Sequence, residues 1–231
     1  MATAKIHFKP YFDEVLAAEA LEKALRNKEK LKVLEILVSV NNTQRQMIRT
    51  PYKTRYGKDL EEEIKKVFSG DFEDFLVALL QTPTKLDVTE LNRAVKGVEK
   101  FDAFKIFATS NGAHIQKVIE EVERQSGKDF QKIVDKELSG DFKNLILSLI
   151  ETSSNKPRFL ANSIHLATKG MGTRDKDLIR ILVARSENDL VLIEHEFQVL
   201  FGKPLTQLIK EECKTEYRDG LTMLVKGNSR P

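Results

Sequence analysis

The stretch "SGDFEDFLVALL" at residues 69–80 returns as "SGDFKNLILSLI" at residues 139–150. In both copies apolar residues recur at the spacing of one helix face, and a serine precedes them where its hydroxyl could cap the helix. We predict a helix in each copy, with Ser69 or Asp71 as the cap of the first. The side chains expected to face the core of the first are Phe72, Phe75, Leu76 and Leu79.

Other segments recur in the same order, which indicates an internal repeat. One set is "YGKDLEEEI" at 56–64, "SGKDFQKIV" at 126–134 and "FGKPLTQLI" at 201–209. Each unit is expected to form a bundle of about five helices, because no hairpin pattern interrupts the helical ones. The sequence therefore predicts an all-α protein. Its expected segments are a short N-terminal stretch at 1–13 and three repeats at 14–82, 83–153 and 154–231.

Composition narrows the class of protein. The chain has 231 residues, of which 41% are hydrophobic and 32% charged, as in a folded, soluble domain. A net charge of +3 is too small to indicate nucleic-acid binding. The N-terminus does not resemble a signal peptide, and no apolar run is long enough to span a membrane. Cys213 is the only cysteine, which favours a reducing compartment. We expect a cytoplasmic protein whose membrane contact, if any, is peripheral.

The connection between the first two helices differs in the last unit. There the sequence reads "KGMGTRD" (169–175), against "RNKEK" (26–30) and "KGVEK" (96–100). Gly170 and Gly172 permit positive φ and allow backbone carbonyls to turn outward. Such carbonyls are hard oxygen ligands of the kind Ca²⁺ prefers, although a carboxylate would have to complete the site. Thr173 could cap the next helix, with Asp175 in its first turn. From the loop alone, a plain glycine-rich connection remains the alternative.

Together these motifs resemble the annexin family. The resemblance rests on "KGMGT", "LIRILVARSENDL", "TQRQMI" and "SGDF" before an apolar helix, and it extends over residues 10–227. It implies an annexin-like array of five-helix repeats and calcium-dependent binding of phospholipid. Carried over residue by residue, it implies Ca²⁺ ligands from the carbonyls of Thr168, Gly170 and Gly172 and the carboxylate of Glu212.

The resemblance also implies how the protein would contact a membrane. Ca²⁺ would bridge the loop to an anionic lipid phosphate. Met171 would dip toward the acyl chains, while Lys169 and Arg174 would attract anionic headgroups.

Cys213, beside the proposed ligand Glu212, is interpreted as a buried or idle thiol rather than a redox sensor.

The chain departs from the family pattern in two ways. The first and middle units lack the glycine loop, and Val67 replaces the acidic residue in the first, although Glu137 keeps it in the middle unit. The family usually has four repeats, whereas this chain has three, and the middle one begins like a second repeat and continues like a third. We infer an internal deletion that leaves an apolar face without its usual neighbour, and expect self-association or marginal stability.

Two functions remain open from the sequence. The first is a calcium-dependent, phospholipid-binding peripheral membrane protein. The second is a calcium-insensitive helical scaffold or protein-interaction module, because two of the three loops are lost. We do not expect an enzyme, since no nucleophile–base motif is present and the four histidines lack metal-like spacing. These are His7, His114, His165 and His195.

Overall fold

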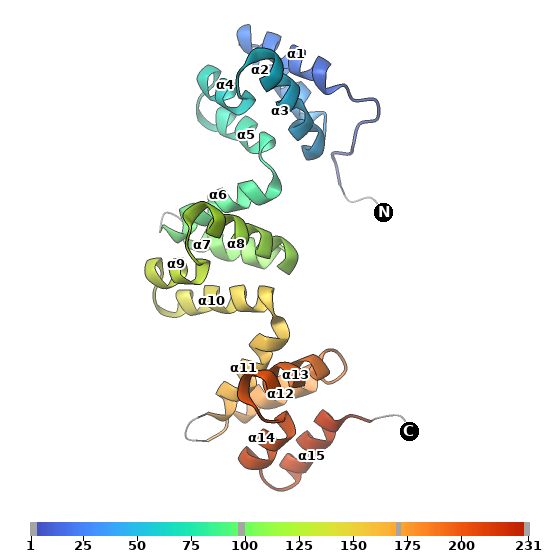
Figure 1. Ribbon diagram of the computed structural model, residues 1–231, viewed down its shortest axis with the longest axis vertical. Coiled ribbons are helices and arrows are strands. Elements are labelled where there is room, and N and C mark those ends of the chain that lie inside the picture. Colours follow the sequence, from blue (N-terminus) through green and yellow to red (C-terminus); the bar gives the residue numbers. More distant parts are fainter. Residues whose placement is uncertain (1–3, 97–99, 170–171, 229–231) are drawn as a thin grey trace. The chain divides into compact units, whose positions relative to one another are not determined.

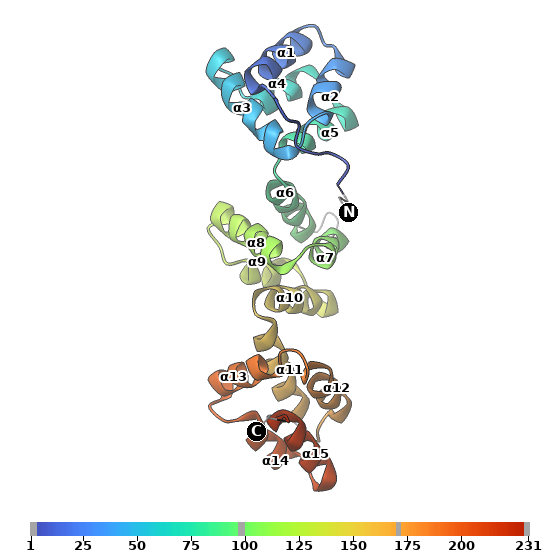
Figure 2. The same cartoon turned by 90° about the vertical axis from the view of Figure 1, so that its right-hand side faces the viewer.

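The computed structural model describes residues 4–96, 100–169 and 172–228. Within these ranges it contains fifteen α-helices and no strand, which confirms the predicted all-α class (Figures 1 and 2). The chain forms two compact units, residues 1–90 and 91–231. In the described ranges, no helix is both long and apolar enough to cross a membrane.

The helices fall into three successive sets of five, which we call the first, middle and last repeats. The first repeat comprises α1 (Glu14–Arg26), α2 (Lys30–Val38), α3 (Asn42–Tyr56), α4 (Leu60–Val67) and α5 (Gly70–Leu80). The middle repeat comprises α6 (Pro83–Val95), α7 (Lys100–Thr109), α8 (Gly112–Ser126), α9 (Phe130–Glu137) and α10 (Gly140–Ser154). The last repeat comprises α11 (Lys156–Thr168), α12 (Asp175–Arg185), α13 (Leu190–Phe201), α14 (Leu205–Glu212) and α15 (Thr215–Lys226).

The third helix of every repeat ends in the same way. Gly57, Gly127 and Gly202 follow α3, α8 and α13, with φ of 67°, 65° and 67°. A residue with a side chain is strained in this left-handed conformation, so glycine is favoured at each end. This shared stop turns the chain into the short fourth helix of each repeat.

The first and last repeats each enclose a core of their own. In the first repeat, Leu21, Ile48 and Ile64 are fully buried and bring α1, α3 and α4 together. In the last repeat, Ile164, Ile193 and Ile209 do the same for α11, α13 and α14, which lie in the orange and red part of Figure 1. Each core forms because the apolar stripe of one helix faces those of its neighbours.

Some details of the predicted α5 are wrong. Leu76 is buried and Phe72 and Leu79 pack against the core, as expected, but Phe75 is 49% exposed. Ser69 occupies the N-cap position, yet its side chain makes no capping hydrogen bond, and Asp71 lies inside the helix. The apolar stripe of α5 is therefore narrower than its sequence indicates.

Candidate metal site in the last repeat

The glycine loop of the last repeat joins α11 to α12. α11 ends at Thr168 and α12 begins at Asp175. The backbone N–H of Arg174 donates a 2.7 Å hydrogen bond to the carbonyl of Ala167, which closes the base of the loop. Gly172 has φ of +89°, a conformation that residues with a side chain rarely adopt. The sequence prediction of a positive φ is confirmed at Gly172.

The start of α12 differs from the prediction. The N-cap residue is Arg174, which makes no side-chain capping bond. Instead of capping the helix, the hydroxyl of Thr173 donates a 2.7 Å hydrogen bond to a carboxylate oxygen of Asp175. The predicted Thr173 cap is therefore wrong, because the hydroxyl binds a side chain rather than the backbone. Asp175 does lie in the first turn, where its charge favours the positive end of the helix dipole.

Glu212 is the last residue of α14, and it is exposed. Within the described part of the chain, its carboxylate makes no hydrogen bond or ion pair. The preceding residue is different, since the Glu211 carboxylate accepts hydrogen bonds from Lys203 and Gln207. Of these two neighbouring carboxylates, only that of Glu212 is available to an added cation.

Charges at the start of α12 and at the end of α14 both act on Cys213. Burial raises the pKa of the Cys213 thiol, and the negative charges of Asp175 and Glu212 raise it further. The carboxylates of Asp175 and Glu212 therefore act on the same thiol from two helices. The packing of α12 and α14 against α15 brings these groups together. The spacing of the residues along the sequence does not predict this proximity.

Tyr217 lies against the same group of residues. Its hydroxyl is buried and has no hydrogen bond of normal geometry to any described residue. Burial, together with the nearby charge of Asp175, raises the pKa of Tyr217 to about 12. Sequence reasoning missed this residue, because a lone tyrosine in an amphipathic helix is usually part of the core.

The remaining predicted residues are placed as follows. Lys169 is exposed directly after α11, and Arg174 is exposed with an ion pair of 3.7 Å to Asp177. Gly170 and Met171 lie outside the described residues. In the described ranges, no group of three or more His, Cys, Asp or Glu side chains is arranged to hold a metal. A cation here would thus depend mainly on backbone oxygens, with a single free carboxylate, and that donor set fits Ca²⁺.

The corresponding connection in the first repeat is short and closed. The N–H of Glu29 donates a 2.9 Å hydrogen bond to the carbonyl of Ala24, and Lys28 takes a positive φ of 56° without being glycine. Val67 stands where the last repeat has Glu212. In the middle repeat the matching acid, Glu137, is paired with Lys136 at 3.2 Å. In its described residues, neither repeat combines a glycine loop with a free carboxylate.

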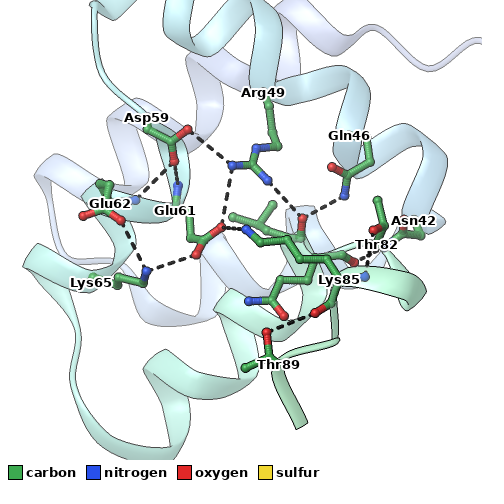
Figure 3. Close-up of polar contacts among 12 residues, drawn as sticks. Asn42, Gln46, Arg49, Asp59, Glu61, Glu62, Lys65, Thr82, Lys85 and Thr89 are labelled. Carbon is green, nitrogen blue, oxygen red and sulfur yellow. Dashed lines mark hydrogen bonds and ion pairs between the residues drawn. The ribbon is translucent and has the colours of Figure 1, made fainter. Parts of the chain in front are cut away.

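Acidic side chains of the first repeat serve its structure instead (Figure 3). The buried Glu61 carboxylate accepts hydrogen bonds from Lys65 at 3.0 Å and Lys85 at 3.2 Å, and lies 3.6 Å from Arg49. Burial alone would raise the pKa of Glu61, but the hydrogen bonds from the two lysines outweigh it and lower the pKa. This network joins α3, α4 and the start of α6. The Glu61 carboxylate is fully engaged in it and is therefore not free.

Comparison with known proteins gives a consistent result. The sequence model of the Annexin family matches residues 16–79, 86–149 and 159–224. The chain is 27% identical to human annexin A11 over 307 aligned positions, covering 95% of the chain and 61% of annexin A11. It is 28% identical to annexin A1 of Cavia cutleri over 306 positions, covering 94% and 88%. The structure of chicken annexin V superposes with a TM-score of 0.58 at 24% identity, covering 96% of this chain and 98% of that one.

The two sequence alignments, with annexin A11 and with annexin A1, are longer than the chain itself. Each runs over more than 300 positions, whereas the chain has 231 residues. Both relatives therefore contain residues within the aligned region that this chain lacks.

Proposed function

The chain belongs to the annexin family, and we propose that it is a calcium-dependent, phospholipid-binding peripheral membrane protein of the cytoplasm. The observation that carries the proposal is that the last repeat has both a glycine loop and a carboxylate that makes no ion pair. Gly172 adopts a positive φ in that loop, and Glu212 makes no ion pair within the described part of the chain. This combination occurs in the last repeat and is absent from the described parts of the other two.

Calcium would be held by oxygen atoms from the loop and by Glu212. The carbonyls of Thr168, Gly170 and Gly172 would supply neutral ligands, and Glu212 the negative charge. A Ca²⁺ ion takes six to eight oxygens, so positions would remain for water or a lipid phosphate. The ion would then bridge two negative partners that otherwise repel, and no chemical step would be needed.

Residues beside the loop would add to the attraction. Lys169 has no ion pair to any described residue, so its full charge would face anionic headgroups. Such a charge near the membrane contributes about 1 kcal/mol. Arg174 would contribute less, because it also pairs with Asp177. Met171 would insert its apolar side chain toward the acyl boundary.

The proposal is tested by sedimentation with anionic liposomes across a Ca²⁺ titration. Glu212→Gln keeps the size of the side chain but removes its charge, so half-maximal binding should need at least about tenfold more Ca²⁺. Glu137→Gln is the matched control, since its loop has no second glycine, and Thr168→Ala should also be mild because only its carbonyl is used. Identical titration curves for the wild type and Glu212→Gln would sink the site assignment.

A second candidate function is a calcium-insensitive interaction module. It is favoured by apolar side chains exposed on the second helix of each repeat, including Leu31 (74%), Phe101 (61%) and Val183 (56%). Leu31 and Phe101 occupy equivalent positions of their repeats, and exposed apolar residues of this kind could bind a protein partner or a second copy of the chain. A dimer in analytical ultracentrifugation without calcium would support this alternative.

A further inference from the structure

The middle repeat contains a cleft with an apolar wall and a basic rim. It has a volume of about 720 Å³ and lies between the C-terminal ends of α6 and α8 and the helix α9. Its apolar lining includes the buried side chains of Val95 and Val122 and the partly buried Ile133. Four exposed lysines also line it: Lys96, Lys128, Lys132 and Lys136.

The positive charge of these lysines is only partly offset by carboxylates. Two acidic residues share the cleft, Asp129 and Glu137. The Asp129 carboxylate accepts a hydrogen bond from the backbone N–H of Lys132 as the cap of α9, and Glu137 is paired with Lys136. Among the described residues, no ion pair engages the ammonium groups of Lys96, Lys128 and Lys132. An excess of positive charge therefore remains beside an apolar wall.

The equivalent lysines of the first repeat are neutralised. Lys58 and Lys66 both bind Glu63, at 3.1 and 2.8 Å. The neighbouring Lys65 contacts Glu61 and Glu62 (Figure 3).

The middle repeat has lost these acidic partners. Glu62 and Glu63 of the first repeat correspond to Lys132 and Ile133, because the two repeats are offset by 70 residues. In the last repeat, Glu211 pairs with Lys203, and the position of Glu211 is taken by Lys136 in the middle repeat. Compared with the equivalent positions of the other two repeats, the middle repeat therefore has more positive charge around α9.

We propose that this cleft binds a phosphate group directly, without calcium. A phosphate monoester carries about −1.5 to −2 charges at neutral pH, and lysine binds phosphate as a point charge. Nearby apolar side chains reduce solvent screening and strengthen the attraction. The ligand is the phosphate of a lipid headgroup or of a soluble phosphate compound. This proposal does not depend on calcium binding in the last repeat.

The test uses the full chain with a chelator present throughout. The double variant Lys128→Gln/Lys132→Gln removes two of the three unpaired charges, one just before α9 and one within it. The control, Lys58→Gln/Lys66→Gln, removes the same total charge from the first repeat, at the positions that correspond to Lys128 and Lys136. The probes are inorganic pyrophosphate, measured by calorimetric titration, and phosphatidylcholine vesicles containing phosphatidic acid, measured by sedimentation. Circular dichroism confirms that each variant is folded.

We expect the Lys128→Gln/Lys132→Gln variant to lose about tenfold or more in affinity, with the control within about twofold of the wild type. A loss restricted to pyrophosphate assigns the cleft to a soluble compound, and a loss restricted to vesicles assigns it to a lipid headgroup. The proposal is overturned if the wild type binds neither probe, if the cleft variant binds as well as the wild type, or if both variants weaken equally.

Discussion

The hydroxyl of Tyr52 donates a 2.6 Å hydrogen bond to the carboxylate of Glu22 inside the first repeat. Tyr52 is fully buried and Glu22 is 6% exposed, so α3 and α1 are joined through a polar contact within an apolar core. The second carboxylate oxygen of Glu22 accepts a hydrogen bond from Arg26 at 2.7 Å. The buried charge of Glu22 is therefore satisfied on both oxygens, as a stable core requires.

Tyr52→Phe should destabilise the first repeat. The change keeps the ring but leaves one oxygen of a buried carboxylate without its donor, and a hydrogen bond to a charged group contributes about 1.5–3 kcal/mol. We expect the free energy of unfolding in urea to fall by about 2 kcal/mol. Tyr56→Phe is the control, because the Tyr56 ring packs against Tyr52 at 5.2 Å and no described residue hydrogen-bonds its hydroxyl. An equal effect of both changes would show that the Tyr52–Glu22 bond contributes nothing.

Acid should weaken the same repeat. Burial alone would raise the pKa of Glu22, but hydrogen bonds from Tyr52 and Arg26 lower it below 4.5, and the pKa of Glu61 is lowered in the same way. A carboxyl whose pKa is lower in the folded state stabilises the fold above its unfolded pKa, and this contribution is lost as the pH falls through the folded value. The melting temperature should stay level from neutral pH to about 5 and then fall. Glu22→Gln should reduce the slope of that fall in circular dichroism.

Gly172→Ala should affect both the loop and calcium binding. An added Cβ would meet no atom within 4 Å, so the cost comes from the φ of +89° alone, and is about 1 kcal/mol. We expect a small loss of stability and a clear rise in the Ca²⁺ needed for liposome sedimentation. Gly220→Ala, in the interior of α15 with the same open space, should instead stabilise the helix by up to about 1 kcal/mol. Opposite signs for these two changes are the expected result.

Cys213 should react slowly with thiol reagents in the folded protein. Its side chain belongs to the core of the last repeat, and the residue is only 5% exposed. Alkylation by iodoacetamide should therefore follow the opening of this repeat, and added Ca²⁺ should slow it if the ion binds the folded form. Rapid labelling of the native protein, followed by mass spectrometry, would contradict this interpretation of the thiol.

The helical repeat was predictable because it is recorded in local patterns. The recurrence of "SGDF" before an apolar run, and of a glycine after each third helix, requires no knowledge of distant contacts. The exposed side of α5 was not predictable in this way. Phe75 lies in an apolar run, but whether a neighbouring helix covers it depends on packing across the repeat.

The candidate site was predictable only in part for the same reason. Gly172 could be assigned a positive φ from its loop alone. The proximity of Asp175, Glu212 and Tyr217 to Cys213 arises from the packing of three helices. The Thr173 hydroxyl donates its hydrogen bond to the Asp175 side chain, and so it does not cap the backbone. Predicting the basic cleft requires both the sequence and the structure. Its lysines are visible in the sequence. That they lack acidic partners becomes clear only by comparison with the ion-paired lysines of the other repeats.

The separate cores of the first and last repeats have a consequence for calorimetry. Since each core is built from residues of a single repeat, the repeats can melt as distinct cooperative units. Calcium bound to the last repeat would raise the transition temperature of that unit, by a free energy that grows with the logarithm of the ion concentration. The transition of the first repeat would stay in place. Heating scans at increasing Ca²⁺ should then separate one endotherm into two, and a shift of both together would mean that the repeats melt as one.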